Sequence, residues 1–139
     1  MKLKKLLSII FISLLVISCS SAPISGRKQL LLVDEAPLIQ QSYAQYRQVL
    51  NQSVVLNNNN AKVVKKVGNN IAKAVERYFQ LHPKERKSNI KYAWEFNLLK
   101  DKTPNAWCMP GGKVAVYTGI LPYTQNEQGL AVVMSHEIA

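Results

Sequence analysis

The feature that most constrains this chain is a histidine-glutamate pair, His136-Glu137, near the end of an apolar run that starts at Leu130. The pair matches the first half of the pattern H-E-x-x-H, in which two histidines four residues apart lie on one face of a helix and bind zinc. The glutamate of that pattern acts as a general base. The second histidine falls at position 140, one residue beyond Ala139. The pair alone is a weak signal, so the rest of the sequence decides its weight.

The N-terminus has the pattern of an export signal. Three lysines precede an apolar run over residues 6–17, which is too short for a comfortable transmembrane helix. The run ends in Val-Ile-Ser-Cys, and a small residue before Cys19 is typical of a bacterial lipoprotein signal. We therefore expect a signal peptide over residues 1–18, lipidation of Cys19, and a tether over residues 19–33. The alternative is an uncleaved anchor in which Cys19 has no role.

Charge and cysteine content limit the partners. The sequence carries 18 Lys and Arg against 8 Asp and Glu, for a net charge of +10, of which the three signal lysines contribute +3. The remaining +7 suits a protein near anionic lipids or glycans. The basic residues are scattered and match no nucleic-acid-binding motif, so we expect no nucleic-acid partner. Lipidation of Cys19 leaves Cys108 without a disulfide partner, and we expect it to be a buried small residue.

Two helices are predicted in the first half of the chain. Apolar residues three and four apart predict the first over residues 36–51. The asparagine run Asn57–Asn60 offers an N-cap at Asn60 for the second, whose apolar stripe ends near Leu81. The lysines and arginines of this helix lie away from the stripe, and a solvated surface is the plainer interpretation of them. His82 is expected to lie on the surface and not to bind zinc.

Strands and a last helix are predicted in the second half. Alternating apolar and polar residues predict a half-buried strand over residues 92–98. The β-rich segments 106–109 and 113–117 flank Pro110-Gly111-Gly112 and predict a hairpin. Asn126 is expected to cap the last helix. The buried face of that helix is expected to carry Leu130, Val133, Met134 and Ile138.

Together these segments resemble a known family. The runs Asn105-Ala106-Trp107-Cys108-Met109-Pro110-Gly111-Gly112, Val114 to Leu121 and Leu130 to Ala139 follow the order N-A-x-x-x-P-G-G, strand, helix, H-E-x-x-H. This order is similar to that of the zinc metallopeptidase family of the CAAX prenyl endopeptidase, HtpX and the mitochondrial Oma-type proteases. The lipoprotein signal and the segment Ser25 to Leu30 are similar to the periplasmic lipoprotein branch of that family.

The resemblance implies roles for the residues of the site. In the family, zinc is bound by both histidines of the motif and by a glutamate from a later helix, with water in the fourth position. By this resemblance His136 is the first zinc ligand and Glu137 the general base. The segment Val114-Ala115-Val116 belongs to the edge strand along which an extended peptide pairs. Gly111-Gly112 allows the tight turn before that strand.

Compared with the family, the sequence stops inside the motif. The second histidine and the later glutamate fall beyond Ala139, and a catalytic zinc needs three protein ligands. We therefore expect residues 34–139 to form the N-terminal part of a zincin-like α+β domain, with helices around a small antiparallel sheet. The chain is expected to be either a fragment of a longer product or an inactive truncated one.

The implied function is a membrane-anchored zinc metalloendopeptidase of the bacterial envelope. Its expected role is protein quality control, with unfolded or misassembled envelope proteins as substrates. Ser20, directly after Cys19, implies sorting to the outer membrane, facing the periplasm. One alternative is a non-catalytic envelope lipoprotein that binds client or partner chains through the same edge strand. Another is a basic glycan- or lipid-binding lipoprotein, whose binding would be sensitive to salt.

Overall fold

The computed structural model describes residues 19–21, 28–30, 35–86 and 91–139. The predicted signal peptide and the rest of the predicted tether lie outside these residues. The chain divides into two units, Met1–Asp34 and Glu35–Ala139. In the first unit, β1 (Cys19–Ser21) pairs antiparallel with β2 (Lys28–Leu30) within the predicted tether. None of the helices in the described part is both long and apolar enough to span a membrane.

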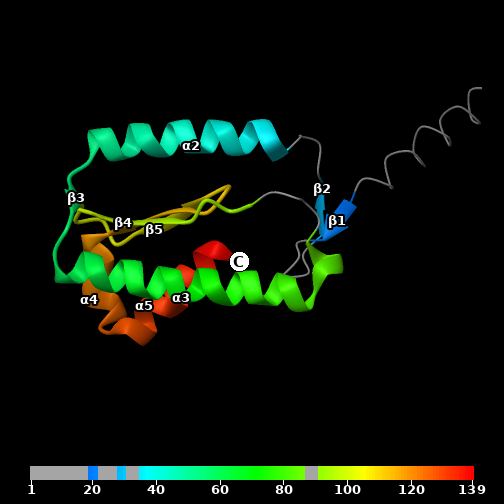
Figure 1. The fold of residues 1–139 in the computed structure, drawn as a ribbon. Coiled ribbons are helices and arrows are strands. Elements are labelled where there is room, and N and C mark those ends of the chain that lie inside the picture. The colour runs from blue at the N-terminus through cyan, green and yellow to red at the C-terminus, as the bar shows by residue number, and fades with distance from the viewer. Residues whose placement is uncertain (1–18, 22–27, 31–34, 87–90) are drawn as a thin grey trace, which may run out of the picture. The chain divides into compact units, whose positions relative to one another are not determined.

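The second unit is a sheet covered by helices on both faces. Figure 1 shows α2 along one face and α3, with α4 and α5 beside it, along the other. The helices are α2 (Glu35–Gln52), α3 (Asn59–Leu81), α4 (Leu121–Thr124) and α5 (Glu127–Ile138), with short 3₁₀ turns η1 (Pro83–Glu85) and η2 (Thr118–Ile120). The strands are β3 (Val55–Leu56), β4 (Glu95–Leu99), β5 (Ala106–Met109) and β6 (Lys113–Tyr117). The predicted α+β class is confirmed.

The sheet is mixed and not wholly antiparallel as predicted. Its strand order is β3-β4-β6-β5. The predicted hairpin of β5 and β6 is confirmed, with Ala106 opposite Val116. However, β4 pairs with β6 in parallel, with Phe96 opposite Val114. The cause is that β5 pairs on the far side of β6, so the hairpin presents β6 and not β5 to β4.

Strand β4 is buried on both faces, so the prediction of a half-buried strand is wrong. Phe96 and Leu98 pack in the core that α3 covers, as the alternation indicated. On the other face Asn97 is also buried. Its Nδ2 donates to the Tyr46 hydroxyl at 3.1 Å, so the buried amide is hydrogen-bonded. Tyr46 of α2 in turn donates to the Val114 carbonyl at 2.7 Å. These bonds satisfy buried polar atoms under α2 and tie that helix to the sheet.

The two long helices agree closely with prediction. The helix predicted over residues 36–51 is α2, and α3 ends at Leu81 as predicted. The N-cap of α3 is Asn58 and not Asn60, since the Asn58 Oδ1 accepts from the Ala61 amide at 3.0 Å. The buried face of α3 carries Ala61, Val64, Val67, Gly68, Ala72 and Phe79. His82 follows the helix and is exposed, as expected.

Candidate active site

The register of α5 is fixed at its first turn. Asn126 caps the helix as predicted, and its Oδ1 accepts from the Gly129 amide at 2.9 Å. Glu127 lies in the first turn, where a negative charge is favourable, and forms an ion pair with Lys66 of α3 at 2.8 Å. Leu130 and Met134 are buried, which confirms the predicted core face. This register places His136 and Glu137 in the last turn, with His136 exposed and Glu137 half-buried.

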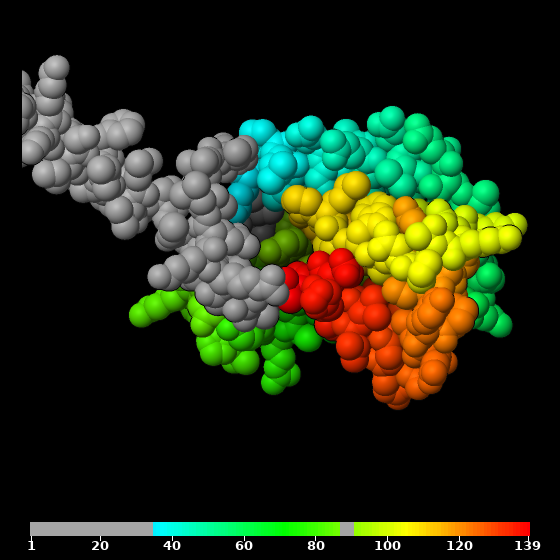
Figure 2. Space-filling model, turned by 180° about the vertical axis from the view of Figure 1, so that it is seen from behind, coloured from blue at the N-terminus to red at the C-terminus, as the bar shows by residue number. Residues whose placement is uncertain are grey.

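The last turn of α5 lies against strand β5. The two elements are in contact, and Figure 2 shows the red surface of the C-terminal residues beside the yellow surface of the β5 region. Burial raises the pKa of the Cys108 thiol on β5 to about 11, and the negative charge of Glu137 contributes to the increase. Glu137 is therefore close enough to Cys108 for its charge to act on the thiol. The structure thus brings the predicted general base next to β5.

The turn before β6 is held in a conformation that requires glycine. Gly111 and Gly112 both have φ of +85°, a region that L side chains rarely adopt. A Cβ on Gly111 would lie 2.5 Å from the Tyr43 ring, and one on Gly112 would lie 2.7 Å from the Trp94 ring. The Ser42 hydroxyl on α2 also donates to the Pro110 carbonyl at 2.8 Å. The predicted tight turn is present and is fixed against α2.

The prediction that Val114, Ala115 and Val116 belong to an edge strand is wrong. All three are 0 % exposed, and β6 pairs with β4 on one side and β5 on the other. The edge strand next to α5 is β5, since no strand in the described part of the chain pairs with its outer side. Sequence could predict both strands of the hairpin but not which one lies outside, because the β4–β6 pairing is made between residues far apart in sequence.

The hydrogen-bond pattern shows which backbone groups of β5 face outward. The Asn105 carbonyl accepts from the Tyr117 amide at 3.0 Å, so Asn105 and Tyr117 form a hydrogen-bonded pair of the antiparallel ladder. Hydrogen-bonded and non-hydrogen-bonded pairs alternate along an antiparallel ladder. Trp107 therefore also bonds to β6, whereas the amides and carbonyls of Ala106 and Cys108 point away from it. These outward groups form the edge of the sheet next to α5.

The metal-ligating side chains near His136 do not complete a zinc site. Among residues 35–86 and 91–139, no three His, Cys, Asp or Glu side chains cluster closely enough to hold a metal ion. His82 lies beside Glu85, 3.9 Å from its Oε1, after the end of α3. Since a catalytic zinc needs three protein ligands, the described residues, which offer His136 alone, do not by themselves fit zinc.

Comparison with known proteins shows the family of the chain. Residues 61–139 match the model of peptidase family M48, a span that includes most of α3, the whole hairpin and α5. The chain belongs to peptidase family M48. Within the family it is similar to the mitochondrial metalloendopeptidase OMA1 of Schizosaccharomyces pombe, with 54% identity over 46 residues, which is 33% of this chain and 14% of that protein.

Two other relatives show the same partial similarity. The mitochondrial metalloendopeptidase OMA1 of Saccharomyces cerevisiae is 46% identical over 48 residues, 33% of this chain and 14% of that protein. A Vibrio cholerae protein that carries the name of a beta-barrel assembly-enhancing protease is 38% identical over 52 residues, 37% of this chain and 11% of that protein. The matched segments therefore span a small part of the length of these family members.

Proposed function

We propose that the protein is a membrane-anchored zinc metalloendopeptidase of the bacterial envelope. The observation that carries this proposal is the position of His136-Glu137, on a capped helix next to an edge strand, within a segment that matches a peptidase family. The proposed substrates are unfolded or misassembled envelope proteins, whose extended segments can pair with a strand edge. The Vibrio cholerae relative is named as a protease that enhances β-barrel assembly, and this name is consistent with envelope proteins as substrates.

The two motif residues have different proposed roles. His136 is exposed, so its imidazole is free to bind zinc, and it would be one ligand of three. Glu137 is half-buried beside β5 and would accept a proton from the attacking water, as a general base does. The further ligands would come from outside the described residues.

The proposed peptide-binding edge is β5 and not β6. The outward amides and carbonyls of Ala106 and Cys108 can bond to an extended peptide as a neighbouring strand would, which is β-augmentation. A peptide bound there would run past the last turn of α5, because α5 contacts β5. This arrangement would bring a peptide bond near Glu137.

Two substitutions in the full gene product test these roles. Glu137→Gln should retain zinc and lose casein hydrolysis by a factor on the order of 10²–10⁴, because glutamine cannot accept a proton from water. His136→Ala should lose zinc and hydrolysis together, because two remaining ligands hold zinc poorly. Gln128→Ala, on an exposed position of the same helix, serves as the control and should keep both. Metal content and hydrolysis are measured on all three.

Two results would contradict the proposal. Loss of zinc from Glu137→Gln would make Glu137 a ligand, and near-normal hydrolysis by that variant would remove it from catalysis. An encoded protein that binds casein but neither holds zinc nor cleaves would favour the non-catalytic binding protein, with β5 as its binding edge.

A further inference from the structure

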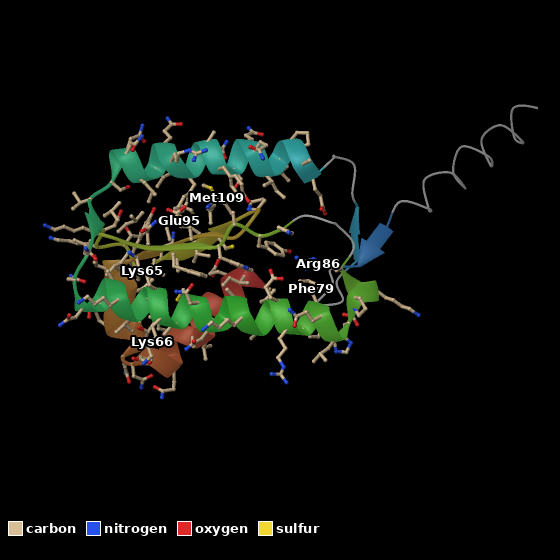
Figure 3. All side chains as sticks on the ribbon, viewed as in Figure 1. Lys65, Lys66, Phe79, Arg86, Glu95 and Met109 are labelled. Carbon is tan, nitrogen blue, oxygen red and sulfur yellow. The ribbon has the colours of Figure 1, made fainter. Side chains whose placement is uncertain are left out.

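Helix α3 has one strongly basic face. Figure 3 shows two of its side chains, Lys65 and Lys66, on the N-terminal half of the helix. At about 100° per residue, the basic positions fall within an arc of about 120°, and they extend over about 22 Å of helix. All are exposed. The residues of this basic face are Lys62, Lys65, Lys66, Lys73 and Arg77.

Most of these charges have no counter-ion in the described part of the protein. Lys66 pairs with Glu127, but the other four make no ion pair or hydrogen bond there. Glu76, the one acidic residue of α3, is 3.4 Å from Arg86 and accepts from the Trp94 indole at 3.5 Å. Surface helices are commonly stabilised by oppositely charged pairs at i,i+4, whereas Lys62 and Lys66, and Lys73 and Arg77, are like-charged pairs at that spacing. An anionic partner would relieve this repulsion.

The arc of the basic face carries no apolar side chain. Asn69, Glu76 and Gln80 fall within it, and Leu81, at the end of the helix beside it, is exposed. The apolar side of α3 is used in the core, against β4 and α5. The helix therefore cannot insert an apolar face into a bilayer as an interfacial amphipathic helix does. Any binding through this face is electrostatic and stays at the level of charged headgroups.

A hollow beside the basic face adds a place for an anionic group. Its volume is about 630 Å³. Lys73 and Arg77 line it together with uncharged Asn69 and Gln80 and with apolar Ala72, Leu81 and Trp94. The one acid at its wall, Glu76, is already bound to Arg86 and Trp94. Arginine and lysine both bind phosphate oxygens, so Lys73 and Arg77 at one opening suit a phosphate group.

We propose that the basic face of α3 binds the phosphate headgroups of an anionic phospholipid membrane. A membrane is the partner that the sequence favours, because residues 6–17 and Cys19 predict attachment to one. A single-stranded nucleic acid is a poorer match, since such surfaces interleave cations with stacking aromatic rings. The arc of basic positions carries no aromatic ring, and Trp94 at the hollow is bonded to Glu76. Each lysine or arginine near an anionic membrane strengthens binding about fivefold.

Binding through this face leaves the candidate active site open. In Figure 1, α3 lies in front of α5, whereas the view from behind in Figure 2 shows α5 and β5 at the surface. Helix α3 and the β5 region thus lie on different sides of the second unit. A membrane bound at α3 would not cover the outward groups of Ala106 and Cys108.

Vesicle sedimentation of the full chain tests the proposal without any catalytic measurement, so its failure is distinct from failure of the proposed peptidase activity. The face variant carries Lys62→Gln, Lys65→Gln, Lys73→Gln and Arg77→Gln. The control variant removes the same charge from exposed sites elsewhere, with Arg47→Gln, Lys91→Gln, Lys100→Gln and Lys102→Gln. Glutamine preserves helix propensity, and circular dichroism checks that both variants keep their helix content. The probes are vesicles of phosphatidylcholine alone and of phosphatidylcholine mixed with phosphatidylglycerol.

The expected result is selective. On phosphatidylglycerol vesicles at low salt, the face variant should bind more weakly than wild type by a factor on the order of several hundred, and the control variant should stay within a few-fold of wild type. The difference should vanish at about 1 M salt, where the screening length falls to about 3 Å. Phosphatidylcholine vesicles report binding through the apolar N-terminal run, and wild type and both variants should bind them equally. Equal losses by the two variants would overturn the proposal, as would a face variant that loses binding to a single-stranded oligonucleotide but not to vesicles.

Discussion

Cys108 is a sensitive reporter of the residues around it. Burial and then the negative charge of Glu137 raise the pKa of its thiol to about 11. At neutral pH the thiol is therefore protonated, and only the thiolate is a good nucleophile or zinc ligand. Cys108 is half-buried and not fully buried as the sequence predicted, and its side chain packs against the core on β5.

The reactivity of Cys108 measures the contact between α5 and β5. In a Cys19→Ser background, alkylation should be slow at neutral pH and should rise with a midpoint near pH 11. Glu137→Gln should lower that midpoint, because removal of a negative charge favours the thiolate. Glu127→Gln is the matched control, since Glu127 lies on the same helix but pairs with Lys66. An unchanged midpoint in Glu137→Gln would place Glu137 away from β5.

The same thiol makes stability depend on pH in the alkaline range. Because the folded state raises the pKa above the ordinary value of 9.0, folding holds the proton more tightly than the unfolded chain does. The contribution of Cys108 to the free energy of unfolding should therefore be constant below about pH 9 and should decrease as the pH rises toward 11. Cys108→Ala should reduce this dependence in urea unfolding measured across that range. The part that remains comes from groups such as Tyr46, whose pKa is also raised by burial.

At the level of elements, the helices could be predicted from sequence and the strand order could not. A helix is specified locally, so apolar residues three and four apart were enough to place α2 and the end of α3. The exact cap differed because each asparagine of the run offers the same side chain, and backbone geometry selects Asn58. His136 and Glu137 were placed correctly on a capped helix for the same local reason, while their chemical roles remain predictions.

The sheet depends on contacts between distant residues. The pairing of Phe96 with Val114 and the bond from Tyr46 to Val114 set the position of β6, and neither leaves a periodic signal in the sequence. The alternation in β4 correctly indicated which side chains face α3. It could not show that α2 also covers the opposite face, where a hydrogen-bonded asparagine is buried.

Substitution at a single backbone position tests β5 as the binding edge. The amide of Cys108 points away from β6, so Cys108→Pro should leave the sheet bonds intact, as proline does on outward positions of edge strands. It should nevertheless weaken binding of unfolded casein, because one donor for the added strand is lost. Cys108→Ala keeps the amide and removes the thiol, and it should bind casein as wild type does. Casein binding and thermal unfolding are compared for both.

A large loss of thermal stability in Cys108→Pro alone would show that its amide bonds within the sheet. Casein binding that is equal in the proline and alanine variants, with stability retained, would remove the β5 edge as the binding site.

For the whole molecule, the proposed lipid anchor and the proposed basic face act together. Several acyl chains on one residue give stable membrane attachment, and a basic patch adds electrostatic binding to the same surface. The lipid would be carried at Cys19 in the first unit and the cations by α3 in the second, so the two signals belong to separate parts of the chain. Linking the lipid anchor to a basic face increases overall binding without any new contact.

The lipid anchor is tested by fatty-acid incorporation and by extraction from membranes. Wild type should incorporate a labelled fatty acid and should require detergent for extraction, and Cys19→Ser should not incorporate the label.

Because an unprocessed signal could itself hold the chain in the membrane, a third form replaces residues 1–19 with a cleavable secretory signal. That form should be extracted by high salt, since the remaining attachment is electrostatic. Adding the four face substitutions to it should make it soluble at low salt, whereas the four control substitutions should not. A label that persists in Cys19→Ser would contradict lipidation at Cys19, and a non-lipidated form that resists high salt would show that something other than charge holds it.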